Sequence, residues 1–288
     1  MITDNKGNNY YKVALHQHST LSDGKLPPEE IARIYKSSGY DALALTDHWK
    51  YGDSRELEGL HIISGCEFNV GGNHETMHIV GFGMEHDPKL DPEMPRQEIV
   101  DGINNAGGIA VIAHPAWSLN SMDDVRELDG VEATEIYNSV SEQGQSLRAY
   151  SDHFVDLCAR NGYRYGILAT DDAHYYGGID DRKGWVMVNA SELTDKAIVE
   201  AIKARRFYAS QGPELYVEYK DGKLVIDCSP CSVIAVLSDG AWLPQRVIRE
   251  QNLTHYEYPI CKDDIWARVE VRDEEGKCAW SNIFELNN

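Results

Sequence analysis

The stretch Val13-Ala14-Leu15-His16-Gln17-His18 gives the clearest indication of the fold, because a short apolar run passes directly into two histidines. Three later apolar runs end in a similar way, in Asp47-His48, in His114-Pro115 and in Asp171-Asp172-Ala173-His174. A short apolar run bounded by turn signals is typical of a buried, parallel strand. Polar residues at its end lie at the carboxyl edge, where α/β barrels and open sheets place their sites. The four runs therefore predict a metal site that collects imidazole and carboxylate groups.

Patterns typical of strands and helices alternate through the first 210 residues. Strands are predicted at 13–16, 42–46, 61–67, 77–83, 109–114, 131–137, 165–171 and 185–188. Helices are predicted from Pro27 to Gly39 and over 93–105, 145–161 and 194–205. Alternating strands and helices form parallel βα units, and about seven or eight such units suffice for a barrel. Residues 1–210 are therefore expected to form an α/β barrel.

The pattern changes after residue 210. Alternating segments rich in β-branched and aromatic residues occupy 215–219, 223–228, 233–237, 254–258, 266–272 and 279–284. Asp221-Gly222 and Glu275-Gly276 are typical of hairpin turns. Residues 211–288 are expected to form a small antiparallel β module, and its single histidine, His255, argues against a second metal site.

The composition limits the partners that we expect. The chain has 47 acidic and 27 basic residues, a formal charge of −20, and no run rich in lysine or arginine. Because this charge repels a phosphate backbone, nucleic acid is not expected as a partner. No apolar stretch approaches the roughly 20 residues that span a bilayer, so no membrane is expected either.

The cysteines indicate a reducing compartment. The six cysteines are scattered, and the first residues do not form the pattern of a signal peptide, so a cytoplasmic location is expected. The pair in Cys228-Ser229-Pro230-Cys231 could serve a zinc or redox site, but alternating apolar residues around it favour two reduced cysteines in a strand.

Several candidate ligands follow from spacing and burial. In His16-Gln17-His18 the two imidazoles point to the same side of a strand, because side chains alternate with period two. Asp172 and His174 have the same spacing. Glu67 ends an apolar run, where a carboxylate is costly unless it is paired or bound to a cation.

Two aspartates have alternative interpretations. Asp23, in Ser22-Asp23-Gly24, is either a turn residue or a ligand on a loop that folds back over the strand end. Asp171 is either a hydrogen-bond acceptor for a ligating imidazole or a solvated loop carboxylate.

Taken together, the motifs resemble those of the polymerase-and-histidinol-phosphatase (PHP) superfamily. The motifs are His16-x-His18, Ser22-Asp23-Gly24, Thr46-Asp47-His48, Gly65-Cys66-Glu67, Met77-His78, Ala113-His114-Pro115 and Asp172-Ala173-His174. The resemblance covers residues 10–190 and implies a distorted, seven-stranded β/α barrel with up to three divalent metals.

The resemblance also implies three ligand sets. They are His16, His18, Glu67 and Asp172; His78 and His114, which share Glu67; and Asp23, His48 and His174. Glu67, Asp23 and His174 are expected to take part in catalysis. Neutral imidazoles and carboxylates suit Zn, Mn or Fe, so two or three of these divalent ions are the expected cofactors.

Such a site predicts a hydrolase. Divalent cations lower the pKa of a shared water from about 15.7 towards 7 and neutralise the leaving oxygen. We therefore expect a phosphoesterase that cleaves a small, anionic phosphorylated metabolite with a metal-bridging hydroxide as nucleophile. Arg148 and Arg182 are either anion clamps or surface charges, and Asn138 either lines the pocket or packs in a loop.

Two other functions stay open. Segments 185–188, 206–213 and 279–282 resemble the branch with the carbaryl hydrolases and their C-terminal β module, so a carboxylic ester or carbamate hydrolase is an alternative. The third interpretation is a non-catalytic metal-binding module that docks a partner.

Overall fold

The computed structural model describes residues 1–4, 7–72, 75–242 and 245–286. The first part contains the strands β1 (Ile2–Thr3), β2 (Asn9–Ala14), β3 (Ala42–Ala44), β4 (Arg55–Leu57), β5 (Leu60–Ile63), β6 (Gly65–Val70), β7 (Met77–Phe82), β8 (Ile109–Ile112), β9 (Ala133–Asn138), β10 (Gly166–Thr170), β11 (Trp185–Val188) and β12 (Phe207–Ser210). Its helices are α1 (Pro28–Ser37), α2 (Arg96–Asn105), α3 (Pro115–Ser118), α4 (Met122–Arg126), α5 (Asp152–Arg160) and α6 (Asp195–Lys203), with a π-helical turn η1 (Ser141–Gln145). The remaining strands are β13 (Leu215–Lys220), β14 (Lys223–Ser238), β15 (Val247–Pro259), β16 (Trp266–Arg272), β17 (Cys278–Trp280) and β18 (Phe284–Glu285).

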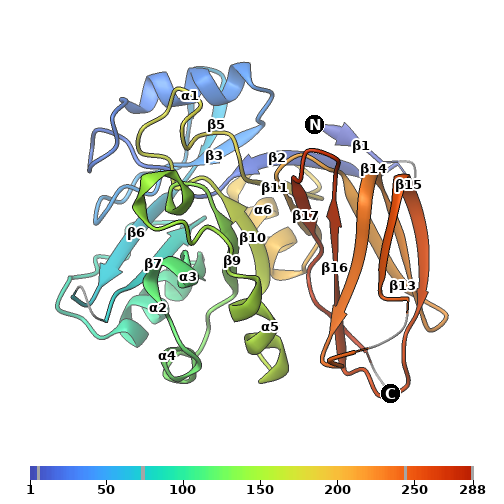
Figure 1. Ribbon diagram of the computed structural model, residues 1–288. Coiled ribbons are helices and arrows are strands. Elements are labelled where there is room, and N and C mark those ends of the chain that lie inside the picture. The colour runs from blue at the N-terminus through green and yellow to red at the C-terminus, as the bar shows by residue number, and fades with distance from the viewer. Residues whose placement is uncertain (5–6, 73–74, 243–244, 287–288) are drawn as a thin grey trace.

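The strands form two sheets (Figure 1). The larger sheet has the order β13-β14-β16-β17-β12-β11-β2-β3-β5-β4, with β1, β15 and β18 paired to β2, β14 and β16. The smaller sheet has the order β10-β9-β8-β7-β6. The protein is therefore a mixed α/β protein, and among the described residues the strands do not close into one hydrogen-bonded ring of seven.

The expectation of parallel βα units is only partly met. The pairs β2–β3, β3–β5, β8–β9 and β9–β10 are parallel. In contrast, β6–β7, β7–β8 and β11–β2 are antiparallel. Among the described residues no helix lies between β6 and β7, whereas β7 and β8 are antiparallel although α2 lies between them. The predicted helix over 145–161 begins only at Asp152, because η1 ends at Gln145 and Tyr150 then forms an isolated β-bridge with Tyr137.

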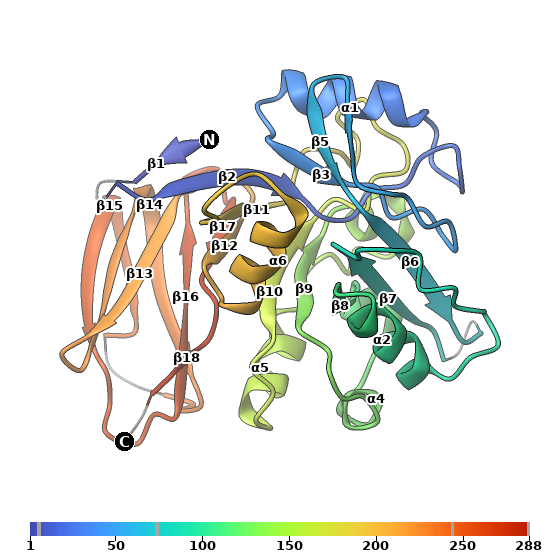
Figure 2. The same ribbon diagram turned by 180° about the vertical axis from the view of Figure 1, so that it is seen from behind.

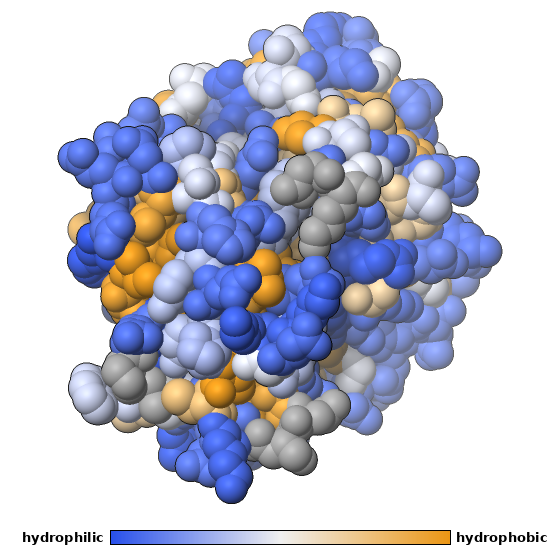
Figure 3. All heavy atoms as spheres, turned by 90° about the vertical axis from the view of Figure 1, so that its right-hand side faces the viewer, coloured by the Kyte–Doolittle hydropathy of each residue, from blue (hydrophilic) through white to orange (hydrophobic). Residues whose placement is uncertain are grey.

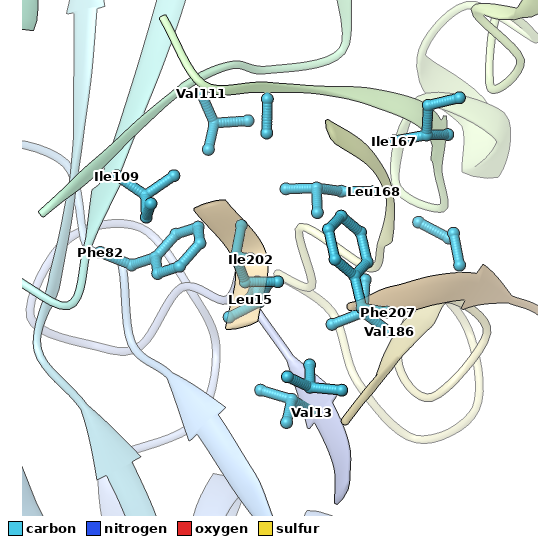
Figure 4. Close-up of a cluster of buried hydrophobic side chains, with 14 of the residues drawn as sticks. Val13, Leu15, Phe82, Ile109, Val111, Ile167, Leu168, Val186, Ile202 and Phe207 are labelled. Atoms are coloured by element: carbon cyan, nitrogen blue, oxygen red, sulfur yellow. The ribbon is translucent and has the colours of Figure 1, made fainter. Parts of the chain in front are cut away.

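The two sheets share one apolar core. Figure 4 shows Val13 and Leu15 facing Phe82, Leu168 and Ile202 across it. These side chains come from both sheets and from α6, which lies beside β11 and β12 when the molecule is seen from behind (Figure 2). The core therefore fixes the strand ends of both sheets relative to each other.

The C-terminal strands form the predicted antiparallel module. Both predicted hairpin turns are confirmed, between β13 and β14 and between β16 and β17. The boundary predicted at residue 210 falls at the end of β12, whose pairing with β17 continues the sheet across it. Figure 3 shows the outer face of the module, where hydrophilic side chains predominate between scattered hydrophobic patches.

Two further findings concern the cysteines and the helices. The six cysteines are free thiols, and the Sγ atoms of Cys228 and Cys231 lie 3.6 Å apart in β14. Among the described residues, every helix is too short or too polar to cross a bilayer.

Candidate metal centre

The nine predicted metal ligands come from strands of both sheets. His16 and His18 follow β2, His48 follows β3, His114 follows β8, and Asp172 and His174 follow β10; Glu67 and His78 lie within β6 and β7, and Asp23 lies in the loop before α1. Isolated parallel bridges join Gln17 to Ala173 and His48 to Glu67. These bridges hold the segments beside one another at the same end of the core.

The nine side chains form three overlapping groups. In each group the nitrogen and oxygen atoms lie within 4.8 Å of one another. The groups are His16, His18, Glu67 and Asp172; Glu67, His78 and His114; and His18, Asp23, His48 and His174. They coincide with the implied ligand sets, except that His18 also lies beside the third, and the assignment of each residue to a metal stays a prediction.

Glu67 lies between two of these groups. Its Oε1 is 2.8 Å from His78 Nδ1 and 3.3 Å from His114 Nε2. Its Oε2 is 2.9 Å from His18 Nε2 and 3.2 Å from His16 Nε2. The two carboxylate oxygens thus face different sets of imidazoles, which is the arrangement that a bridging carboxylate requires.

The packing of the donor atoms fits bound cations better than hydrogen bonding. The Nε2 atoms of His16 and His18 are 3.2 Å apart and point towards the same carboxylates. Two buried atoms, Asp172 Oδ1 and His48 Nδ1, form no hydrogen bond of good geometry among the described residues, although His18 Nε2 lies 3.1 Å from the first and Glu67 Oε2 lies 3.3 Å from the second. Buried polar atoms are rarely left without a partner. Imidazole and carboxylate groups are also the donors that Zn, Mn and Fe accept, so the residues present fit such ions.

The carboxylates control the protonation of the imidazoles around them. Burial lowers the pKa of His18, but the hydrogen bonds and charges of Asp172 and Glu67 outweigh this effect and raise it to about 9. Burial raises the pKa of Glu67, yet the charges of His16 and His78 and the hydrogen bond of His114 hold this pKa well below its usual value. The cluster therefore attracts positive charge, and because protons and metals compete for the same nitrogens, metal binding should release protons.

Glu135 orients several ligands and was missed in the sequence. Its Oε1 accepts a hydrogen bond from His16 Nδ1 at 2.7 Å, and its Oε2 accepts the backbone N–H of His114 at 2.7 Å. This contact turns His16 Nε2 towards the cluster, as carboxylates behind ligating histidines commonly do. The available signal was a carboxylate inside the apolar run 131–137, the same signal that identified Glu67.

Asn138 supports the same network. Its side-chain amide donates to Glu135 Oε2 at 2.8 Å and to Asp172 Oδ2 at 3.2 Å. The residue is 1% exposed, so it lies behind Asp172 and not on the surface of a pocket.

Asp47, which was not among the predicted site residues, holds the loop that carries Asp23. Asp47 accepts hydrogen bonds from the backbone N–H and hydroxyl of Ser19 at 2.7 and 2.8 Å, and from those of Ser22 at 3.1 and 2.8 Å. Asp47 thereby fixes the turn that places Asp23 beside His48 and His174.

Asp171 fits neither interpretation given above. It is fully buried and accepts the Tyr35 hydroxyl at 2.6 Å and the backbone N–H groups of Arg182, Lys183 and Gly184. Burial raises its pKa to about 6 in spite of these hydrogen bonds. It anchors the segment that follows β10, and among the described residues its hydrogen-bond partners are Tyr35 and this segment instead of a ligating imidazole.

A cavity of about 220 Å³ opens over the three groups. Besides ligands, its walls include Trp117, Val140 and Ser141. The Trp117 ring lies edge-on to His114, with the ring centroids 4.9 Å apart. No lysine or arginine is among the described residues that line this cavity, which we call the metal cavity.

The two arginines considered as anion clamps lie elsewhere. Arg148 is exposed in the loop after η1. Arg182 donates from Nε to Asp181 at 2.6 Å and lines a different cleft. Within the described residues, the structure therefore brings neither side chain to the metal cavity.

Two characterised proteins resemble this chain in sequence. A 5'-3' exoribonuclease of Haemophilus influenzae is 29% identical over 183 residues, which cover 58% of this chain and 66% of that protein. A 3',5'-nucleoside bisphosphate phosphatase of Chromobacterium violaceum is 35% identical over 79 residues, covering 25% and 28% of the two chains. The matches thus span about two thirds and about a quarter of these relatives.

Two solved structures share the fold. One is a two-domain protein from Bacteroides vulgatus that contains a predicted PHP-like metal-dependent phosphoesterase. Its TM-score is 0.60 at 17% sequence identity, and the match covers 99% of this chain and 97% of that protein's chain. Endonuclease Q in complex with a 27-mer duplex carrying an abasic lesion has a TM-score of 0.51 at 17% identity, covering 68% and 57%.

These findings correct one expectation. The exclusion of nucleic acid is wrong, because an exoribonuclease is a sequence relative and an endonuclease bound to DNA has a similar fold. The formal charge of −20 describes the whole chain. A cluster of divalent cations can nevertheless dominate the local field and attract phosphate, so net charge did not justify the exclusion.

The family is established by a match along most of the chain. The model of the PHP domain matches residues 14–233, a range that contains all nine clustered side chains and extends into β14. The chain belongs to the PHP domain family.

Proposed function

We propose that this protein is a metal-dependent phosphoesterase that hydrolyses a phosphate ester of a nucleotide, free or at the end of a nucleic-acid strand. The observation that carries the proposal is the position of Glu67 between two donor groups within a set of nine ligand-type side chains. The names of the exoribonuclease and the bisphosphate phosphatase support the substrate class.

Some residues of the site would bind the cations, and others position the side chains that bind them. The three groups described above would each hold one cation. When bound, divalent cations lower the pKa of a water molecule and neutralise charge on the reacting ester. Glu135 and Asn138 fix His16 and Asp172, and Asp47 fixes the loop of Asp23. Trp117 and Val140 form the apolar part of the cavity wall.

The architecture enters this proposal in two ways. We take the two sheets of residues 1–210 to be the halves of a distorted seven-stranded barrel, since they share one core and are bridged at the site. We take residues 211–288 as a module that completes one side of this body.

A carboxylic ester or carbamate hydrolase is the second candidate. It is favoured by the lining of the metal cavity, where the described residues include Trp117 and Val140 but no lysine or arginine. An uncharged ester needs no cationic clamp, whereas a phosphate must rely on the metals alone.

One screen separates the two candidates. Purified protein loaded with Mn, Zn or Fe is assayed with nucleotide monoesters and diesters, short oligonucleotides, carboxylic esters and aryl carbamates. We expect phosphate release that a chelator abolishes and that Asp172→Asn, prepared in parallel as a contamination control, lacks. Turnover of carbamates or carboxylic esters without any phosphate ester would replace the first proposal by the second. No turnover with any metal would contradict both.

A further inference from the structure

A second cavity lies next to the metal cavity and has different chemistry. This junction cleft, of about 740 Å³, is bounded by the β2–β11 face, the segment after β10, the loop after β9 and the β16–β17 turn. The turn η1 separates the two cavities, because Ser141 lines the metal cavity whereas Glu142 and Gln143 line the junction cleft. A molecule that extends beyond the metal cavity over η1 would enter this cleft.

Lys12 gives the cleft a positive charge without an ion-pair partner. Its Nζ lies 4.0 Å from the centroid of the Tyr40 ring and 3.8 Å from that of the Trp185 ring. Among the described residues Lys12 forms no ion pair, and the two carboxylates that act on it from further away are already engaged. Asp41 accepts the N-terminal ammonium at 2.8 Å, and Asp171 accepts the Tyr35 hydroxyl and backbone N–H groups.

A second donor in the cleft also lacks an acceptor. The hydroxyl of Tyr40 has no hydrogen-bond partner among the described residues, although Tyr40 is only 2% exposed. Leaving a buried hydroxyl unpaired is costly, so such a group usually indicates an acceptor that the protein itself does not supply. An ammonium and a hydroxyl on one wall are both donors, and an anionic oxygen would satisfy both.

The rest of the cleft adds aromatic surface but no net charge. Arg182, Lys183 and Lys277 line it together with Asp181, Glu142 and Glu275, and two of these basic side chains are paired, Arg182 with Asp181 and Lys277 with Glu275. Tyr150 is 44% exposed at the opposite boundary, between the loop after β9 and Gln211. Exposed aromatic rings beside cations are the usual platform for stacked bases in proteins that bind single-stranded nucleic acid.

We propose that the junction cleft binds a mononucleotide unit, with its phosphate at Lys12 and Tyr40 and its base against the exposed ring of Tyr150. This site is distinct from the metal cavity and does not depend on the proposed catalytic function. Burial of Lys12 lowers its pKa to about 8, so its charge in the free cleft is weakly held and an anion would stabilise it.

Binding to the metal-stripped protein tests the site without turnover. Adenosine monophosphate is titrated into protein kept in chelator and followed by calorimetry and tryptophan fluorescence, with adenosine and ribose phosphate as fragments. We expect saturable binding of the nucleotide and weaker binding of either fragment. Lys12→Met keeps the apolar stem against both rings but removes the charge, and should weaken binding about tenfold. Lys203→Gln changes an exposed lysine on α6 and should bind as the unchanged protein does.

A milder variant keeps the test valid if Lys12→Met fails to fold. Tyr40→Phe removes only a hydroxyl without a partner, so its thermal unfolding should be unchanged while nucleotide binding weakens. The proposal is overturned if the unchanged protein shows no saturable binding at millimolar nucleotide, or if both variants bind as tightly as it does.

Kinetics then identifies the source of the nucleotide. If the unit is part of the substrate, Lys12→Met should raise KM for a dinucleotide with little change in kcat and leave glycerol phosphate turnover unaffected. If the nucleotide is a separate ligand, it should change glycerol phosphate turnover without competing for the metal cavity. Both results support the site. Failure of the phosphoesterase proposal would appear instead as intact nucleotide binding without hydrolysis of any phosphate ester.

Discussion

At the scale of single residues, Glu67 has the most connected position in the candidate site. It is 1% exposed, and its two oxygens face separate groups of imidazoles. Glu67→Gln removes a charge that both groups share at nearly constant volume. We expect loss of more than one metal equivalent and a fall in kcat of several orders of magnitude.

The comparison variant for Glu67 is His48→Asn. His48 belongs to only one group and is partly exposed, so its loss should remove at most one equivalent. Metal content by mass spectrometry and kcat are measured on both proteins. A Glu67→Gln protein with the full metal complement and near-normal turnover would contradict the bridging assignment.

Glu135 acts through other residues, and a different result is expected from its replacement. Glu135→Gln keeps the shape but removes the charge that orients His16 and the His114 backbone. Such changes behind a ligating histidine typically reduce metal affinity or activity about 10–100-fold, which titration with a competing chelator would measure. The matched control is Glu200→Gln on the exposed face of α6. Equal metal affinity in the two variants would show that Glu135 only fills space.

At the scale of elements, the sequence predicted where strands end better than how they pair. His16, His114 and Asp172 follow their strands as the apolar runs indicated, because hydrophobic periodicity reports burial and its end. Periodicity carries no information about the direction of a neighbour. The prediction of parallel units is therefore wrong for β6–β7 and β7–β8, which are antiparallel.

The break between β5 and β6 illustrates a second limit. The segment His61-Ile62-Ile63-Ser64-Gly65-Cys66-Glu67 is predicted as one strand that ends in Glu67. The structure bends it at Ser64-Gly65, where a Cβ on Gly65 would lie 2.7 Å from the carbonyl oxygen of Leu45. The need for this close approach comes from the packing of another element and is not visible in the local pattern.

The bend is held by α6, and this contact gives a pH-dependent prediction. Asp195, at the start of α6, accepts His61 Nε2 at 2.6 Å and the Ser64 N–H at 3.1 Å. The hydrogen bond to Asp195 is the main reason why the pKa of His61 is raised. Burial acts against the shift of Asp195, but His61 and Ser64 lower its pKa.

The directions of the two pKa shifts define the pH range in which this pair stabilises the fold. Because the pKa of His61 is raised in the folded state, its protonation stabilises the fold fully at pH values below the ordinary pKa of 6.5. This stabilisation is lost as the pH rises through the pKa of the folded state. Because the pKa of Asp195 is lowered in the folded state, its charge stabilises the fold fully at pH values above the ordinary pKa of 3.8. This stabilisation is lost as the pH falls through the pKa of the folded state. Asp195→Asn should therefore reduce the free energy of unfolding by about 1–3 kcal/mol at a pH between these values.

Urea unfolding at pH 5.5 and 8.5 measures this window. The loss in Asp195→Asn should be smaller at the higher pH, because the imidazole of the unchanged protein loses its proton as the pH rises through its raised pKa. Asp152→Asn changes an exposed carboxylate at the start of α5 and should show no such dependence. An equal loss at both pH values would contradict the ion pair.

At the scale of the whole molecule, the C-terminal strands complete the core of the first part. In β17, Ala279 and Trp280 pair with β12, and Trp280 is 1% exposed within the central apolar core. Asn282 accepts the Ile167 N–H at 2.9 Å and donates to the Phe207 carbonyl at 2.7 Å. Most buried apolar side chains after residue 210 form a cluster of their own, yet Trp280 completes the central core, so the first part depends on the C-terminal strands and the boundary itself stays a prediction.

This dependence predicts the effect of truncation. A chain ending at Gly212 loses Trp280 and Asn282, so the edge of β12 and a wall of the core become exposed, and we expect an insoluble protein or one with a much lower Tm. Asn282→Ala is the graded version, which should cost about 1–3 kcal/mol because buried backbone groups lose their partner. Gln251→Ala, at an exposed position of β15, is the control for both in thermal and urea unfolding. A truncated protein with unchanged Tm and metal binding would show that residues 1–212 fold alone, and the module would then have to act on something outside this core.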